Sequence, residues 1–114
     1  MDRLLQILSE MALPFAYDHF AEGESPNTPF ICYLLPGSDN FSADGRVYYK
    51  INEVHIELYC DSKNPALEAT LEAVLDEHGI FYNKTEVWIE SEKLYEVLYT
   101  FEMEAVSYTH LTLP

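Results

Sequence analysis

Basic residues are scarce in this sequence. Six Lys and Arg stand against 20 Asp and Glu in 114 residues, which gives a formal net charge of −14. Affinity for nucleic acid comes largely from Lys and Arg that displace the counterions around phosphates. Anionic membrane surfaces attract basic segments for the same electrostatic reason. The composition therefore excludes unaided binding to either, and it leaves an acidic protein that binds another protein, repels nucleic acid or mimics it.

Cysteine and glycine are also rare. Cys32 and Cys60 are too few for a disulfide scaffold or a structural zinc site. Both stand in apolar, strand-like runs, so we expect two free and buried thiols. The four glycines fall at expected turns or element ends, which argues against a glycine-rich phosphate loop.

Long apolar runs are missing as well. No stretch approaches the roughly 20 apolar residues that a membrane span needs. The N-terminal residues lack the basic lead and apolar block of a secretory signal. We therefore expect a cytoplasmic protein with no membrane partner.

The chain does contain enough apolar residues to fold. Hydrophobic residues make up 48% of it and aromatic residues 14%, which excludes an intrinsically disordered chain. The length suits one domain, which we place at residues 1–104. Residues 105–114 contain no charged side chain and resemble the translation of a transposase adapter used in sequencing libraries. We expect this tail to be non-native and leave it out of the fold prediction.

The first half of the chain predicts one helix and several strands. Apolar residues at helical spacing predict a helix over residues 2–12 that Pro14 stops. A short strand is expected at 15–17, a strand buried on both faces at 30–35, and alternating strands on either side of a bulge at Asn52-Glu53. Residues 21–29 and 36–46 are expected to be surface loops, the second with a tight turn at Asp44-Gly45.

The second half predicts a helix and a hairpin. Asn64 and Pro65 suit the cap and first position of a helix that ends at Gly79. Strands at 85–89 and 95–103 follow, joined by a turn at 91–93. The predicted fold class is α+β, with a four- to five-stranded, largely antiparallel sheet and two helices packed on one face, in the order α-β-β-β-α-β-β.

Few residues suggest chemistry. Asp18-His19 could orient a water or bind a metal, and His55 and Glu57 lie two apart on one strand face. A loop histidine and a solvated or interface-facing strand face explain these residues better than a reaction centre does, and a helix C-terminus explains His78. We therefore expect no enzyme, no catalytic residue, no metal and no cofactor.

A row of large apolar residues among acids is more informative. The outer face of the sheet is expected to carry Tyr59, Trp88, Leu94 and Leu98 between glutamates. Exposed aromatic and apolar side chains usually mark a contact surface. We interpret these four residues as a docking surface for a partner or a second copy. The alternative is that loops of the same monomer cover them.

Four segments of the chain resemble small proteins from the tail-assembly region of siphophages and of prophages of Gram-positive bacteria. The resemblance covers about residues 13–104, most of the chain, and the element order is similar to that of tail-terminator, or tail-completion, proteins. The four segments are Leu13-Pro14-Phe15-Ala16-Tyr17-Asp18-His19-Phe20, Pro29-Phe30-Ile31-Cys32-Tyr33, Val54-His55-Ile56-Glu57-Leu58-Tyr59 and Trp88-Ile89-Glu90-Ser91-Glu92-Lys93-Leu94-Tyr95.

The resemblance implies a structural protein of the virion. It implies a homo-oligomeric ring, commonly a hexamer, that closes the tail tube, docks on the head-side connector and has no active site. The ring would assemble in the host cytoplasm and reside in the tail or neck, where DNA passes through it without being specifically bound. The loops at 21–29 and 36–46 would be candidates for contacts with the tube or the connector.

Two other functions remain open at this point. An acidic inhibitor that mimics DNA would use the charge well but leaves the apolar row unexplained. A small metal-dependent enzyme would have to be built on His19, His55 and Glu57.

Overall fold

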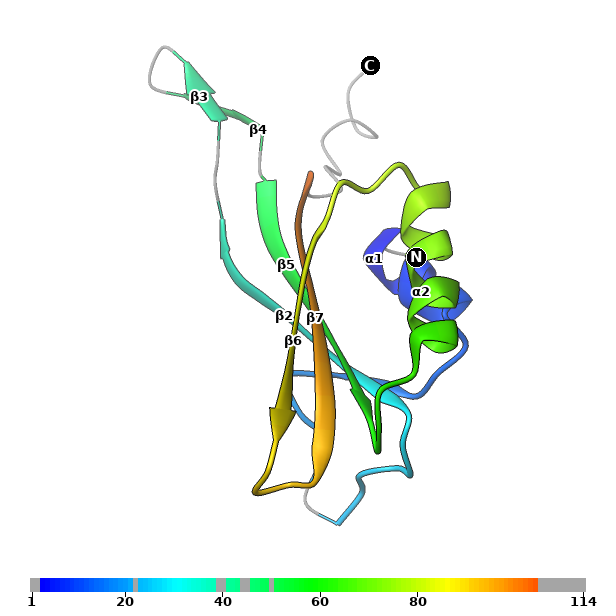
Figure 1. Cartoon of the computed structure of the whole chain (residues 1–114). Coiled ribbons are helices and arrows are strands. Elements are labelled where there is room, and N and C mark those ends of the chain that lie inside the picture. The colour runs from blue at the N-terminus through cyan, green and yellow to red at the C-terminus, as the bar shows by residue number, and fades with distance from the viewer. Residues whose placement is uncertain (1–2, 22, 39–40, 44–45, 50, 105–114) are drawn as a thin grey trace.

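The computed structural model describes residues 3–21, 23–38, 41–43, 46–49 and 51–104. Five strands form the main sheet in the order β1-β2-β5-β7-β6, and β3 and β4 pair with each other in a second, two-stranded sheet. Two helices complete the fold (Figure 1). The elements are α1 (Arg3–Glu10), β1 (Phe15–Tyr17), β2 (Phe30–Ser38), β3 (Phe41–Ala43), β4 (Arg46–Tyr49), β5 (Ile51–Cys60), α2 (Pro65–Glu77), β6 (Asn83–Ile89) and β7 (Leu94–Glu104).

The main sheet confirms the predicted α+β class. Its β1–β2 pair is parallel, and the other three pairs are antiparallel. Both helices lie against one side of this sheet (Figure 1). The longest pairing joins β5 to β7 without interruption, from Ile51 opposite Glu104 to Cys60 opposite Tyr95. β5 and β7 therefore form the centre of the main sheet, with β2 beside β5 and β6 beside β7.

The core lies between the helices and the sheet. Alternate residues of β5 and β7 face the helices because side chains along a strand point to opposite faces in turn. The helices supply apolar residues three and four apart, which fall on one helical face. The buried residues of these four elements include Leu4, Ile7 and Leu8 of α1, Leu71 and Leu75 of α2, Val54, Ile56, Leu58 and Cys60 of β5, and Val97, Tyr99, Phe101 and Met103 of β7.

The ends of α2 follow the local sequence as predicted. The Asn64 side-chain oxygen accepts a hydrogen bond from the Leu67 backbone N–H at 3.2 Å, and Pro65 occupies the first helical position. Gly79 then takes a positive φ of 69°, a conformation that costs glycine little. The predicted cap and stop signals are therefore confirmed.

The segment after residue 35 differs from the prediction. Residues 36–46 were expected to form a loop, but β2 continues to Ser38, and β3 and β4 form a hairpin beyond the main sheet (Figure 1). The turn at Asp44-Gly45 lies outside the described residues. Over the described residues, the register shifts between Leu34 and Gly37 in the β2–β5 pair and between Phe41 and Ser42 in the β3–β4 pair, whereas β5 pairs with β7 without a shift at Asn52-Glu53. Proline has no N–H to donate, and a bulge at Pro36 lets the pairing resume after it.

Burial along β2 also differs from the prediction. Only Ile31 and Cys32 are buried, one on each face, whereas the strand becomes exposed toward its end. The reason is that β1 flanks β2 only as far as Tyr33.

Both cysteines are free and buried, as predicted. Neither helix in the described part of the chain has the length and apolar character needed to cross a membrane.

Candidate interaction surface

The sheet face opposite the helices carries three of the four predicted interface residues. Directly paired residues share a face, so the strand registers identify its members. Tyr59 pairs with Phe30 and with Glu96, and Leu98 pairs with Glu57 and with Thr85. Leu94 lies on the same face, opposite Ile89. Tyr59, Leu94 and Leu98 are all half-buried there.

Trp88 lies on the other face of the sheet. It pairs with Tyr95, which belongs to the β7 row that points toward the helices, and their ring centroids are 6.2 Å apart. The prediction of one row containing Trp88, Leu94 and Leu98 is therefore wrong for Trp88. The hairpin pairs even-numbered residues of β6 with odd-numbered residues of β7, and sequence alternation within each strand does not reveal that offset.

A pair of carboxyl groups shares one phenol on the outer face. The Tyr59 hydroxyl lies 2.9 Å from Glu57 Oε1 and 3.1 Å from Glu96 Oε2. A phenol has one proton, so it donates to one of them at a time. Burial raises the pKa of Glu57; the bond from Tyr59 opposes this rise and the charge of Glu96 adds to it. This arrangement makes the centre of the outer face acidic but only partly solvated.

Aromatic rings cover one end of this face. Phe20 contacts Phe30 edge-on at 5.4 Å between ring centroids, and Phe30 stacks on Tyr59 at 5.3 Å. Cys32 lies on the same face. Burial is the main cause that raises the pKa of its thiol to about 11, and nearby carboxylates add to the rise. The thiol is therefore protonated at neutral pH, which makes it a poor nucleophile.

The helix side of β6 and β7 is held by an ionic network. Lys63 Nζ lies 2.8 Å from Glu68 and 2.6 Å from Glu86, and Lys84 Nζ lies 2.7 Å from both Glu68 and Glu72. Glu68 is buried, and two lysines neutralise it. This network ties α2 to the edge of the sheet.

Two tyrosines extend the network. The Tyr95 hydroxyl donates to Glu86 at 2.6 Å, and the Tyr99 hydroxyl donates to Glu72 at 2.8 Å. Burial alone would raise the pKa of Glu72, but hydrogen bonds from Lys84 and Tyr99 outweigh burial and lower it. The lysine contacts lower the pKa of Glu86. The lysine–glutamate ion pairs and the hydrogen bonds from the two tyrosines together stabilise the fold.

The histidines that suggested chemistry lie in separate pairs. His19 contacts Asp18 at 3.0 Å, His55 contacts Glu53 at 2.6 Å, and His78 contacts Glu10 at 2.9 Å. His55 and Glu57 do share a strand face, as expected, but His55 bonds to Glu53. Over the described residues, no three His, Cys, Asp or Glu side chains converge to hold a metal ion.

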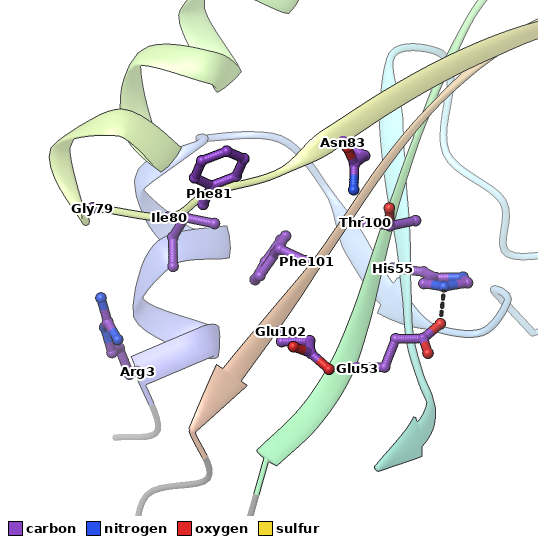
Figure 2. A pocket seen from close by; sticks show the side chains of 10 residues that line it. All are labelled: Arg3, Glu53, His55, Gly79, Ile80, Phe81, Asn83, Thr100, Phe101 and Glu102. Atoms are coloured by element: carbon purple, nitrogen blue, oxygen red, sulfur yellow. Dashed lines mark hydrogen bonds and ion pairs between the residues drawn. The ribbon is translucent and has the colours of Figure 1, made fainter. Parts of the chain in front are cut away.

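An open hollow of about 670 Å³ lies where β7 extends beyond the start of β6. Figure 2 shows that the residues around it come from the start of α1, from the segment that follows α2, and from β5, β6 and β7. Thr100 stands opposite His55 in the strand pairing, and the His55 ring contacts Glu53 Oε2 at 2.6 Å. The residues that line it are Arg3, Glu53, His55, Gly79, Ile80, Phe81, Asn83, Thr100, Phe101 and Glu102.

Exposed large apolar side chains in the described part of the chain lie at the two edges of the main sheet, and one of them, Phe81, also lines the hollow. Phe81 is 91% exposed just before β6, and Val87 and Trp88 on β6 are 51% and 41% exposed. At the opposite edge, Tyr17 of β1 is 51% exposed and Leu35 of β2 is 38% exposed. Among these five residues, only Trp88 belongs to the predicted interface, since periodicity does not reveal which strands end up at an edge.

Comparison with known proteins shows a likeness of fold. No family model matches the sequence, and no curated protein matches it. A chain of a solved structure described as "Virion of native gene transfer agent (GTA) particle" superposes with a TM-score of 0.61. The match covers 87% of this chain and 83% of that chain at 10% sequence identity. This chain therefore shares its fold with a subunit of that particle.

Proposed function

We propose that this protein is a structural subunit of a phage-like particle. The observation that carries the proposal is the shared fold with a chain of the gene transfer agent virion, over most of the length of both chains. The element order of the chain is also similar to that of tail-terminator proteins. Within such a particle, we assign the chain to the tail terminator or head–tail joint, as a homo-oligomeric ring that closes the tail tube in the virion.

The charge of the chain supports this assignment. A ring that surrounds a passage for DNA benefits from a negative lining, because carboxylates repel the phosphate backbone and limit sticking. The partners under this proposal are other copies of the chain, the tail tube protein and the head-side connector. The proposal assigns no reaction, metal or cofactor to the chain.

Assembly of the purified chain tests the proposal. Light scattering at increasing concentration should report a closed oligomer with a fixed mass, a multiple of the 13.2 kDa subunit. Negative-stain images of that oligomer should show rings. Added to tail tube protein from the same phage or prophage region, the rings should bind tube ends and stop tube growth. A chain that stays monomeric at high concentration and leaves tube growth unchanged would contradict the proposal.

The DNA-mimic alternative predicts a different result. A DNA mimic would be a stable monomer that displaces DNA from a basic partner protein. The surface charge favours this reading, but the exposed apolar residues at both sheet edges favour the structural subunit.

A further inference from the structure

The two edges of the main sheet differ from each other, and each carries exposed apolar side chains. One edge is β6, which pairs with β7 on one side and has no neighbouring strand on the other side within the described residues. The other edge consists of β1 and of β2 beyond Tyr33, where β1 has ended. Edge strands present unpaired backbone N–H and C=O groups that another strand can bond. At the β1–β2 edge, the Leu35 N–H already donates to the Tyr17 hydroxyl at 3.3 Å, so a neighbouring strand would have to bond the groups around it.

Both edges carry large apolar side chains that are exposed to solvent. Phe81, Val87 and Trp88 lie at the β6 edge, and Tyr17 and Leu35 lie at the β1–β2 edge. Natural edge strands are normally protected against pairing by charged side chains. The exposed apolar side chains therefore suit contact with another strand.

The charge distribution favours contact between these two edges. The segments 13–17 and 29–38, which build the β1–β2 edge, contain no charged residue. Three of the six basic residues are near β6: Lys84 on the strand, Lys93 in the turn that follows it, and Lys63 bound to Glu86. Repulsion between two chains of charge −14 is therefore weakest where an uncharged edge meets an edge whose carboxylates are paired with lysines.

We infer that neighbouring copies join edge to edge, with β6 of one copy beside the β1–β2 edge of the next. Because the two edges are different surfaces, the contact is head-to-tail. An open chain of copies therefore always has a free β6 edge at one end and a free β1–β2 edge at the other. Such a contact closes into a ring when the rotation from one copy to the next is a whole fraction of 360°. This inference rests on the proposed function, and it names the contact that would build the ring.

Single substitutions at each edge test the inference in the full chain. Val87→Glu adds a charge at the β6 edge, and Leu35→Glu adds one at the β1–β2 edge. Each should weaken self-association on the order of a hundredfold in sedimentation equilibrium, because it places a carboxylate in the contact. Circular dichroism and melting curves check folding, and Thr85→Glu and Tyr17→Glu repeat the test at each edge with independent variants.

Mixing the two variants gives the sharpest result. Val87→Glu keeps an intact β1–β2 edge, and Leu35→Glu keeps an intact β6 edge. Each variant alone should be monomeric, whereas an equal mixture should form a one-to-one dimer that grows no further.

The control is Leu98→Glu, at the outer face predicted from sequence, which should leave self-association unchanged. If the unmodified chain assembles and a chain carrying both Val87→Glu and Leu35→Glu assembles equally well, the inference is overturned and the proposed function stands. Loss of assembly in Val87→Glu but not in Leu35→Glu would also overturn it, because the contact would then join β6 to β6. An unmodified chain that never assembles would overturn both proposals together.

Discussion

Glu57 is a carboxyl group that the fold keeps half-buried beside a second one. Its pKa is raised, first by burial and also by the charge of Glu96. A raised carboxyl pKa means that folding favours the protonated form. This difference in pKa contributes to the free energy of unfolding. The contribution is fully present below the pKa of the unfolded chain, near 4.5, and is lost as pH rises through the pKa of Glu57 in the folded protein.

Replacement of Glu57 by glutamine should therefore stabilise the protein at neutral pH. Glutamine removes the repulsion with Glu96 and still accepts the hydrogen bond from Tyr59. We expect a higher melting temperature at pH 7 and no gain below about pH 4, where the wild-type carboxyl is protonated as well. Glu102→Gln, at an exposed position of the same face, serves as the control. An equal gain in both variants would attribute the effect to net charge alone.

Replacement of Glu68 by glutamine should destabilise the protein, in contrast to the same replacement at Glu57. Glu68 is 2% exposed and contacts both Lys63 and Lys84. Glu68→Gln should lower the free energy of unfolding by about 1–3 kcal/mol, since a buried charged hydrogen bond is lost. The loss stays within this range because each lysine keeps a second glutamate partner. Urea unfolding measures it, and Glu77→Gln, at an exposed position of the same helix, should change little.

At the scale of elements, the start of α2 depends on one side chain. Asn64→Ala removes the acceptor of the Leu67 N–H and should cost about 1 kcal/mol of stability. Asn64→Asp keeps an acceptor oxygen at the same place and should retain most of that stability. Thermal or chemical unfolding of the wild type, Asn64→Ala and Asn64→Asp measures these differences in stability. Equal stability of the Ala and Asp variants would show that the cap contributes nothing.

The β6–β7 hairpin shows the limit of reading elements one at a time. Alternation in each strand was predicted, and both strands form. Which row of β6 shares a face with which row of β7 depends on how the turn sets the register. The turn pairs Ile89 with Leu94, and this pairing carries Trp88 to the helix side.

At the scale of the whole molecule, the net charge governs association. Two copies of charge −14 repel each other, and salt screens that repulsion. Self-association should therefore strengthen as salt rises from about 0.01 M to about 0.15 M. Sedimentation equilibrium at several salt concentrations measures this dependence. A DNA mimic bound to a basic partner would weaken over the same range, so the sign of the salt effect separates the two functions.

Composition and local pattern by themselves determined the acidic character, the α+β class, the boundaries of α2 and the free, buried cysteines. These features follow from neighbours in the chain, such as the Asn64-Pro65 start signal and the alternation along β5. Tertiary structure alone decided the strand order, the hairpin formed by β3 and β4, the face on which Trp88 lies and the identity of the edge strands. The strand order and the edges depend on pairing between residues far apart in sequence, and the two hairpins depend on the register between neighbouring strands. Periodicity within one strand carries no information about either.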